Sequence, residues 1–432
     1  MKKRFLLILA ILLIFNIQVF ATDVTSEGPI RDQNILVPTD HGVDKATYEE
    51  AVLINNLSEK SLENLTTSYL LGDFETGVIL EAYNIDEVRG MASTSKLVSV
   101  YVALDAIKSG QISYDDEVVM DKESSSILGS TYESKEGEKY TVRQLIEAAL
   151  VVSGNDAVTA LGKHVGGTEE HFVEMMNDKC KALGLTNAHM VNPHGLTIYS
   201  PEGEVEGYNQ MTAREMFVLA RSLITDYPEI LEITSMPSIK YEPREFIGYN
   251  TNPILGITEG IDGLKTGYTN IAGRAIIATG EVKGEGTSGD MRLIGITLGS
   301  KGDWARYVAI KKLMEGGFAN YVNEIFSTDE SIGKAKIKDG VPSEVDVRTA
   351  KPVSIIHKKD EEIKADYTYN EDLTYPMEEG DVVGKATYSK GGELLMSVDL
   401  VTMEEVSKPG IANKLRIIIR DIFRDIERAR AA

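Results

Sequence analysis

The chain has little cysteine and little histidine, and both shortages limit the chemistry open to it. Cys180 is the only cysteine among 432 residues, so no intramolecular disulfide can form and no thiolate cluster can hold a metal. The six histidines are scattered, and no His-Glu-x-x-His pattern places two of them on one helical face. His189 and His194 lie close together, but loop histidines so spaced are more often structural than ligands. We therefore expect no metal and no cofactor.

Basic residues are also too few for a nucleic-acid partner. The chain has 45 lysines and arginines against 67 acidic residues, a net charge of −22. Phosphate backbones are bound by basic surfaces, so we expect no nucleic acid to bind. The length and a hydrophobic content of 42% allow two or three domains with a substantial core.

The N-terminus carries the features of an export signal. Lys2, Lys3 and Arg4 precede an apolar run from Phe5 to Phe15, and small residues follow up to Ala21. This run is short for a membrane span and ends in a cleavage-type site, so residues 1–21 are predicted to be a signal peptide. The alternative is an uncleaved anchor. Either way the body is expected outside the cytoplasmic membrane, on its periplasmic or extracellular side.

A buried helix is predicted from Leu97 to the stop signal at Gly110, because apolar residues lie on almost all of its faces. Its first turn carries Ser93 and Lys96, three residues apart and therefore on one face. Burying an ammonium costs several kcal/mol unless it is paired or deprotonated. A nucleophilic serine with a lysine base explains the pair, and free backbone N–H groups at the helix start could hold an oxyanion. The alternative is a lysine that reaches solvent from an ordinary helix end.

Strands before and after a helical middle predict an α+β domain over residues 61–326. A strand, a turn at Glu75–Gly77 and a second strand are expected over residues 68–83. Thr141 begins a capping-box helix, and Ser153 and Asn155 lie in a break before the next helix. Further helices are expected over residues 157–164, 170–183, 212–224 and 304–326, and strands over 275–279 and 291–298.

Three other segments differ from this domain in their sequence pattern. Residues 22–60 are a leader of uncertain order, with a possible helix inside 44–61. The Ser- and Glu-rich residues 121–139 are expected at the surface as a lid or rim. Residues 327–408 alternate between apolar and polar positions and have Gly-containing turns, which predicts a small all-β domain with strands at 335–338, 344–348, 353–357, 365–369 and 394–401.

The last segment, within residues 409–432, is a cationic amphipathic helix by its pattern. Apolar residues from Leu415 to Ile426 recur at helical spacing, while six cations face three acids between Asn413 and Ala432. On a chain this acidic, such a helix is expected to lie on an anionic membrane surface. The alternative is a helix that packs on its own β domain or on a partner.

Three short motifs stand in one order: Ser93-Thr-Ser-Lys96, Ser153-Gly-Asn155 and Lys265-Thr266-Gly267. This set is typical of penicillin-binding proteins and class A β-lactamases. More specifically, the chain resembles the low-molecular-mass penicillin-binding proteins that act as D-alanyl-D-alanine carboxypeptidases. The resemblance runs from Ser68 to the C-terminus and includes Asn192–Leu196 and Met291–Ile294. It implies the penicillin-binding transpeptidase-like fold, a helical cluster with an antiparallel sheet, followed by the all-β domain and the amphipathic helix.

The resemblance also implies roles for the site residues. Ser93 would form the acyl-enzyme with Lys96 as proton acceptor, and the N–H groups of Ser93 and Tyr268 would form the oxyanion hole. Ser153, Asn155 and Lys265 would line the opposite wall. A serine needs a neighbouring base, and Lys265 could supply the second charge that lowers the pKa of Lys96. Ser153 could relay a proton to the departing amine.

The implied substrate is a peptidoglycan stem peptide ending in D-Ala-D-Ala, and β-lactam antibiotics would acylate the same serine. Lys265, Thr266 and Arg292 are expected to hold the terminal carboxylate, although Arg292 could equally be a surface arginine. The first alternative function is a β-lactamase, although the Glu-x-x-Leu-Asn loop of the class A enzymes is missing from the sequence. The second is a non-catalytic penicillin-binding receptor or scaffold, which would release the acyl group slowly.

Overall fold

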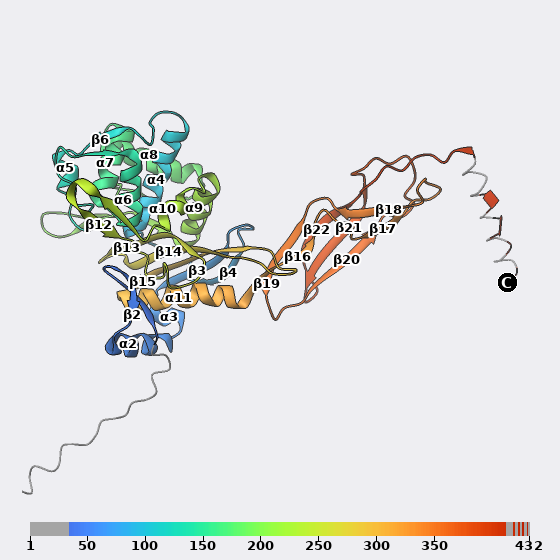
Figure 1. Ribbon diagram of the computed structural model, residues 1–432, viewed down its shortest axis with the longest axis horizontal. Coiled ribbons are helices and arrows are strands. Elements are labelled where there is room, and N and C mark those ends of the chain that lie inside the picture. The colour runs from blue at the N-terminus through green and yellow to red at the C-terminus, as the bar shows by residue number, and fades with distance from the viewer. Residues whose placement is uncertain (1–33, 412–417, 420–421, 424–425, 427–429, 431–432) are drawn as a thin grey trace, which may run out of the picture.

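The structure is a computed structural model that describes residues 34–411, 418–419, 422–423, 426 and 430. Figure 1 shows an elongated molecule, with a larger body of helices and sheet at one end and a smaller all-β body at the other. The signal peptide predicted over residues 1–21 and most of the tail predicted over 413–432 lie outside the described residues. No helix in the described part of the chain is long and apolar enough to cross a membrane.

A five-stranded antiparallel sheet forms the middle layer of the larger body, in the order β13-β14-β15-β3-β4. Its strands are β3 Ser68–Asp73, β4 Ile79–Tyr83, β13 Ile261–Thr269, β14 Gly273–Val282 and β15 Met291–Ser300. Neighbouring residues of a strand point to opposite faces. Ala275 and Ile277 accordingly join one buried cluster, while Ile276 and Ala278 join another. Both faces of the sheet are covered, which explains why its strands are continuous apolar runs in the sequence.

Helices from the middle of the chain cover one face of this sheet (Figure 1). They are α4 Lys96–Lys108, α6 Val142–Val151, α7 Asn155–Gly166, α8 Glu169–Ala182, α9 Ala213–Asp226 and α10 Ile230–Thr234. The capping box predicted at Thr141 is present, because Gln144 N donates to Thr141 Oγ1 and Thr141 N donates to the Gln144 side chain. The α+β prediction is confirmed: strand β3, from before the helices, pairs with β15, from after them.

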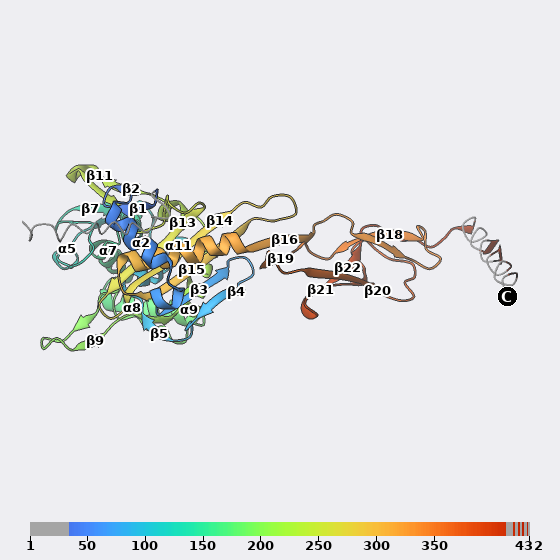
Figure 2. The same cartoon turned by 90° about the horizontal axis from the view of Figure 1, so that it is seen from below.

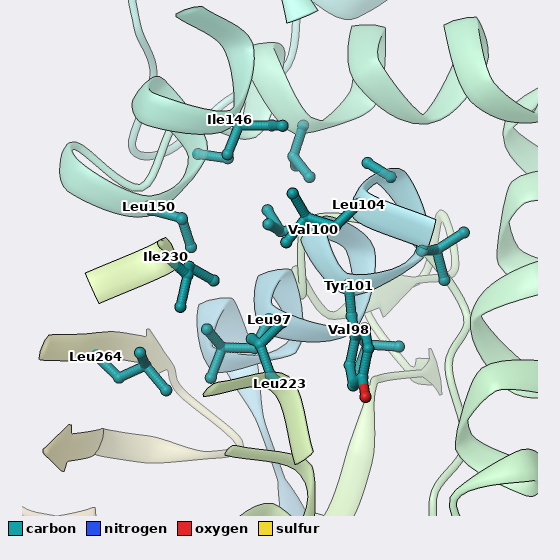
Figure 3. Packing of buried hydrophobic residues seen from close by; sticks show 14 of the residues in the cluster. Leu97, Val98, Val100, Tyr101, Leu104, Ile146, Leu150, Leu223, Ile230 and Leu264 are labelled. Carbon is teal, nitrogen blue, oxygen red and sulfur yellow. The ribbon is translucent and has the colours of Figure 1, made fainter. Parts of the chain in front are cut away.

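Helix α4 is the centre of the helical cluster and is buried on nearly all faces, as predicted. Ten of its 13 residues are buried. Figure 3 shows Leu97 and Val100 of α4 in one cluster with Ile146 and Leu150 of α6 and Leu223 of α9. Because the helix is enclosed by other elements, the position of its first turn is set by the whole core.

The other face of the sheet is covered by α11 Asp303–Asn320, α2 Tyr48–Ser58 and α3 Leu62–Leu65. The helix expected inside residues 44–61 is thus present as α2. It follows a hairpin of β1 Leu36–Thr39 and β2 Gly42–Lys45, so residues 36–58 have more order than the sequence indicated. Val37 is buried, and Tyr307 Oη of α11 donates a hydrogen bond to Leu36 O at 2.6 Å. Strands of four residues are too short to show an alternating pattern, and this hairpin is held by tertiary contacts.

The helix predicted over residues 304–326 is wrong in its last part. Helix α11 ends at Asn320, and β16 Tyr321–Ser327 continues the chain as a strand that pairs with β19 Val353–Lys358. Tyr, Val, Ile and Phe side chains are enriched in this stretch and favour strands. Pairing with β19 makes this stretch a strand and not a helix. Because β19 lies more than twenty residues further along the chain, the local sequence did not reveal the pairing.

The smaller body is an antiparallel sheet in the order β17-β18-β22-β21-β20, joined to the larger body by the β16–β19 ribbon (Figure 2). Its strands are β17 Gly333–Lys336, β18 Glu344–Thr349, β20 Ile363–Tyr369, β21 Val382–Lys390 and β22 Glu393–Thr402. The all-β prediction is confirmed, although β21 was not predicted. Val345, Val347, Val383 and Leu400 lie in its own buried cluster.

Short elements connect the larger ones around the helical cluster. They are η1 Ala92–Ser95, η2 Glu242–Arg244, α5 Lys122–Ser125, β5 Val88–Gly90 paired with β10 Gln210–Thr212, β6 Glu117–Val119 paired with β7 Lys139–Thr141, β8 Ile198–Tyr199 paired with β9 Val205–Gly207, and β11 Ser238–Tyr241 paired with β12 Phe246–Tyr249.

Candidate active site

Ser93 and Lys96 meet where η1 leads into α4. Lys96 Nζ lies 2.8 Å from Ser93 Oγ, as the three-residue spacing predicted. The same amine lies 2.7 Å from Asn155 Oδ1 and 2.8 Å from the backbone oxygen of His194. Two of these neighbours can only accept hydrogen bonds, while the serine hydroxyl can also donate one. The surroundings therefore suit a neutral amine, which donates to both carbonyl oxygens and has a lone pair left for the serine.

Burial of the Lys96 side chain also favours the neutral form of its amine. The side chain is fully buried at the base of α4. This burial holds the pKa of Lys96 well below its ordinary value, the positive charge of Lys265 lowers that pKa further, and the Asp156 carboxylate opposes the shift. Lys265, the second cation expected from the sequence, is thus near enough to lower the pKa of Lys96.

The break between α6 and α7 supplies the opposite wall. Ser153 is buried and has a φ of +63°, in the left-handed region that residues other than glycine rarely adopt. Asn155 begins α7, and its side-chain nitrogen donates to Leu128 O at 2.7 Å while its oxygen faces Lys96. Asn155 therefore connects the lysine to the loop across the cleft.

That loop belongs to residues 121–139, which the sequence placed at the surface as a lid or rim. The Asp156 carboxylate accepts hydrogen bonds from Tyr132 N, Ser134 N and Ser134 Oγ, at 2.8, 3.0 and 2.6 Å. Asn155 N donates to Ser130 O at 2.8 Å. The loop is thus fixed as a rim by the two residues that begin α7.

Strand β13 brings the third motif against η1. A Cβ atom on Gly267 would lie 2.9 Å from Met91 O and 3.0 Å from Ser93 N. Only glycine lets the strand come this near to the backbone of Ser93. Lys265 and Thr266 precede it as buried residues. Burial, and then the charge of Arg306, lower the pKa of Lys265 to about 7.

His194 contributes to the site in a way that its sequence neighbours did not reveal. Its backbone oxygen contacts Lys96 Nζ, and its imidazole Nδ1 accepts a hydrogen bond from Leu196 N at 3.1 Å. Burial and the charge of Lys96 lower the pKa of this imidazole to about 3, so it is neutral at physiological pH. Gly195 has a φ of +89°, and a Cβ there would lie 2.0 Å from Ala92 O. Residues 192–196 therefore pack closely against the turn that carries Ser93.

A cavity of about 580 Å³ opens above these groups. Six residues expected at the site line it: Ser93, Ser153, Asn155, Thr266, Gly267 and Tyr268. Lys96 and Lys265 are buried behind this lining. Residues that were not predicted also line it: Gly129, Ser130, Thr251, Arg274 and Arg306 among them.

Arg292 does not line this cavity, which corrects its expected place at the site. Its guanidinium pairs with Asp262 at 2.8 Å and donates to Thr279 Oγ1 at 3.2 Å. Two other arginines face the cavity instead, Arg274 of β14 and Arg306 of α11. The position of Arg274 could have been found from the sequence, because it pairs with Tyr268 across a tight hairpin turn. Arg306 is brought there only by the packing of α11.

The two cavity arginines share one carboxylate. Arg274 Nη2 and Arg306 Nη2 lie 2.7 and 2.9 Å from the two oxygens of Asp303. The guanidinium of Arg274 also lies over the Tyr268 ring, 3.5 Å from its centre. The Nε atoms of both arginines are buried and have no hydrogen-bond partner among the described residues. Two cations against one anion leave a net positive end to the cavity, suited to a carboxylate.

Taken together, the cavity has a serine hydroxyl in contact with a lysine amine at its base, a second hydroxyl on the facing wall and a cationic end. These groups suit acyl transfer from a substrate that carries a free carboxylate. The helical cluster on an antiparallel sheet, followed by the all-β body, is the fold of penicillin-binding proteins.

Comparisons with known proteins agree with the site. A family model described as D-alanyl-D-alanine carboxypeptidase matches residues 55–302, and one described as the C-terminal domain of penicillin-binding protein 5 matches residues 322–408. The chain therefore belongs to the D-alanyl-D-alanine carboxypeptidase family, a family of serine peptidases.

Named relatives span most of the chain. It is 28% identical to the D-alanyl-D-alanine carboxypeptidase DacF of Bacillus subtilis, over 82% of this chain and 89% of the relative. It is 32% identical to DacA of Haemophilus influenzae, over 81% and 87%. Among solved structures, penicillin-binding protein 5 of Haemophilus influenzae aligns with a TM-score of 0.63 at 30% identity, over 80% of this chain and 98% of that one. Penicillin-binding protein D2 of Listeria monocytogenes, in its ampicillin-bound form, aligns with a TM-score of 0.51 at 30% identity, over 59% and 97%.

The close approach at Gly267 gives a prediction. Gly267→Ala should push β13 away from η1, because the added methyl would meet Met91 O and Ser93 N. A displacement near 1 Å at a reacting centre costs about 100-fold in rate, so labelling of the protein by a fluorescent penicillin should slow by about that factor. In the control Gly316→Ala, the new methyl lies 3.9 Å from its nearest neighbour, Asn320 Nδ2, and labelling should keep the parent rate. Equal rates for the two variants would contradict the prediction.

Proposed function

We propose that this protein removes the terminal D-alanine from peptidoglycan stem peptides through an acyl-enzyme on Ser93, and that penicillin acylates the same residue. The observation that carries the proposal is the contact of Lys96 Nζ with Ser93 Oγ at 2.8 Å, inside a pocket where two carbonyl oxygens take the other hydrogen bonds of the amine. The family is named for this carboxypeptidase activity.

In the first half-reaction, the neutral Lys96 amine takes the proton of Ser93 as its oxygen attacks the carbonyl carbon of the penultimate D-alanine. The negative oxygen that forms is held by the backbone N–H groups of Ser93 and Tyr268. The C–N bond then breaks, and the departing amine of D-alanine takes a proton relayed from Lys96 through the Ser153 hydroxyl. In the second half-reaction, water attacks the ester, and its proton returns through Lys96 as Ser93 is regenerated.

The terminal carboxylate of the substrate is assigned to the cationic end of the cavity. Arg306 and Arg274 take the place first expected for Arg292, and the Thr266 hydroxyl lies in the lining of the same cavity. Lys265 keeps a different role: it lies behind the wall and places its charge near Lys96. A carboxylate held there would put the peptide bond over Ser93, so binding and chemistry share one geometry.

The alternative functions are not favoured. The named relatives of this chain are carboxypeptidases, and the all-β body matches the C-terminal domain of penicillin-binding protein 5. A β-lactamase or an acylated receptor would also use Ser93. Fast release of a peptide acyl group with slow release of a penicilloyl group distinguishes a carboxypeptidase from both.

We further propose that the protein works outside the cytoplasmic membrane. Residues 1–21 serve as the signal peptide, residues 61–326 and 327–408 as catalytic and all-β domains, and the helix at 409–432 as the membrane contact. Six large apolar residues within this range are described, and all are exposed: Ile411, Ile418, Ile419, Ile422, Phe423 and Ile426. Their spacing places them on one face, which supports contact with lipid.

The nucleophile is tested by Ser93→Ala. This variant should lose release of D-alanine from a peptide ending in D-Ala-D-Ala by at least about 1,000-fold, because the covalent route is removed. It should also lose labelling by fluorescent penicillin. The exposed Ser113→Ala serves as the control and should match the parent in both assays. Release of D-alanine by Ser93→Ala at the parent rate would place the nucleophile elsewhere.

The pH dependence of acylation tests the pairing of the two lysines. The amine of Lys96 acts as a base only when neutral, so the rate rises with pH through the pKa of Lys96 and then levels off. Lys265→Met removes a positive charge that lowers this pKa. The pKa of Lys96 should then increase, and the acidic limb of the penicillin acylation rate should move to higher pH. Lys283→Met removes an exposed lysine directly after the end of β14 and should leave the limb in place. A shift to lower pH in Lys265→Met, or no shift, would refute the coupling.

The carboxylate site is tested by comparing two arginines. Arg306→Gln should reduce kcat/KM for a peptide with a free terminal carboxylate by about 10- to 100-fold, the value of a charge-assisted hydrogen bond of roughly 1.5–3 kcal/mol. Arg292→Gln should change it by less than about twofold, because Arg292 pairs with Asp262 and does not line the cavity. The same peptide with a terminal amide should be insensitive to Arg306→Gln. A larger loss in Arg292→Gln would restore the first assignment.

Membrane contact is tested with vesicles. The mature protein should sediment with vesicles containing anionic lipid and less with neutral ones, and added salt should weaken binding because it screens the cations of the tail. A variant that ends at Gly410 should stay in solution while keeping its activity on a soluble peptide. Sedimentation of the shortened variant with anionic vesicles would assign the contact to another part of the protein.

A further inference from the structure

The helix that carries Arg306 begins without a side-chain cap. Helix α11 starts at Asp303, and the residue before it is Gly302, which has no side chain to accept hydrogen bonds from the first N–H groups. This first turn nevertheless places Asp303 and Arg306 at the cationic end of the active-site cavity. Helix ends fray unless other contacts hold them. The position of Arg306 therefore depends on what packs against the first turn of α11.

The β1–β2 hairpin packs against this turn. Residues 38–40, at the tip of the hairpin, line a second cavity of about 550 Å³ together with Trp304 and Arg306. Asp303 and Arg306 lie in the walls of both this cavity and the active-site cavity. Neither the hairpin nor the first turn of α11 lies within residues 55–302, which match the carboxypeptidase family model. The contact between the two segments is therefore not covered by that match.

A buried hydrogen bond joins the hairpin to α11. Tyr307 Oη donates to Leu36 O at 2.6 Å, and the Tyr307 side chain is 1% exposed. Burial raises the pKa of Tyr307 to about 12, so the hydroxyl keeps its proton at physiological pH and remains a donor. Tyr307 follows Arg306 directly and lies one helical turn after Asp303, the carboxylate that pairs with Arg306. A shift of Tyr307 would therefore move the Arg306 guanidinium as well.

Two further contacts hold the hairpin in place. Val37 is 1% exposed and belongs to the same buried cluster as Tyr307. Beside the tip, the ring of His41 packs edge-on against Tyr249 of β12, with 5.8 Å between the ring centres. Because the hairpin is fixed to the core and to β12, it can serve as a rigid support for the first turn of α11.

We propose that the β1–β2 hairpin positions Arg306 for the carboxylate of the substrate, and that Tyr307 is the positioning residue through which the hairpin acts. The inference rests on the proposed function, in which Arg306 holds the terminal carboxylate. Tyr307 does not line the active-site cavity, so its effect on the reaction passes through the Arg306 guanidinium. The hairpin therefore matters for substrates that carry a free carboxylate and not for substrates that lack one.

The test compares a peptide ending in D-Ala-D-Ala with the terminal amide of the same peptide, whose slower reaction is followed at higher protein concentration. Tyr307→Phe removes the hydroxyl and keeps the ring, so the hydrogen bond to the hairpin is lost while the packing stays. It should lower kcat/KM for the acid peptide by about tenfold, the upper value of one hydrogen bond, and leave the amide within about twofold. An equal effect on the two peptides would overturn the inference.

The control Tyr321→Phe makes the same change elsewhere in the same buried cluster. Tyr321 is 5% exposed, lines neither cavity, and donates to Leu80 O at 3.1 Å and to Glu81 Oε1 at 2.7 Å. Both variants should lower the melting temperature, but Tyr321→Phe should leave both peptides within about twofold of the parent. A selective loss that Tyr321→Phe reproduces would show that activity follows stability alone, which would contradict a positioning role.

A double-mutant cycle tests whether Tyr307 acts through Arg306. When Tyr307→Phe is added to Arg306→Gln, kcat/KM for the acid peptide should change by less than about twofold, because the guanidinium to be positioned is already absent. Effects that multiply in the double variant would rule out this route.

Val37→Ala perturbs the same contact from the side of the hairpin. It removes part of the buried anchor of β1 and leaves the sequence of α11 unchanged, so it should lower kcat/KM for the acid peptide more than for the amide. Equal effects on both peptides would show that the hairpin does not position Arg306.

The same measurements separate the inference from the proposed function. If the parent releases no D-alanine, the proposed function is wrong. If Arg306→Gln affects the acid and the amide equally, the carboxylate assignment is wrong and the inference fails with it. If the parent is active and Arg306→Gln is selective while Tyr307→Phe is not, only the role of the hairpin is wrong.

A second measurement uses Trp304, the only tryptophan of the chain. Its ring lies in the first turn of α11, edge-on to Tyr307 with 5.8 Å between the ring centres. Tyr307→Phe should increase quenching of the tryptophan emission by acrylamide, because the turn is held less firmly, whereas Tyr321→Phe should leave it at the parent value. Equal quenching in the parent and in Tyr307→Phe would show that the hydrogen bond to the hairpin does not hold the turn.

Discussion

The structure depends on an amine that is kept out of water. Lys96 is enclosed at the base of α4 with three oxygen atoms around its nitrogen and a second buried lysine nearby. Burying a charged ammonium without a carboxylate partner is unfavourable by several kcal/mol, and the neutral form removes most of that penalty. The same burial that would destabilise a charged lysine favours the neutral amine, and this is the form that the proposed mechanism needs beside Ser93.

Close backbone approaches keep this amine in place. Gly267 lets β13 touch η1, and Gly195 lets the turn after His194 touch Ala92. Ala92 and Ser153 have positive φ angles, a conformation that costs of order 1–3 kcal/mol and persists only where the surroundings impose it. The large buried core on both faces of the sheet supplies that constraint. A site assembled from four distant segments needs such a rigid frame to hold atoms within a few tenths of an ångström.

Most of the fold and the base of the site could be predicted from the sequence. The buried α4 helix, the break at Ser153 and the sheet strands carry local signals: all-round apolar residues, a capping box and continuous apolar runs. The errors lie where the signal is not local. Residues 321–327 form a strand because β19 pairs with them, the β1–β2 hairpin is held by α11, and Arg292 pairs with Asp262 while Arg306 reaches the cavity.

The sequence alone determined which residues are chemically able to act: a serine and a lysine one helical turn apart, and two further motifs in a fixed order. Spacing along a helix is a local property, so it can be predicted without knowledge of the fold. Only the tertiary structure decided which cations face the cavity, which loop forms its rim and what the hairpin encloses, because those depend on contacts between segments far apart in the chain. The charge around a group, its burial and the distance to its neighbours depend on how the segments pack together, so they cannot be read from any single segment.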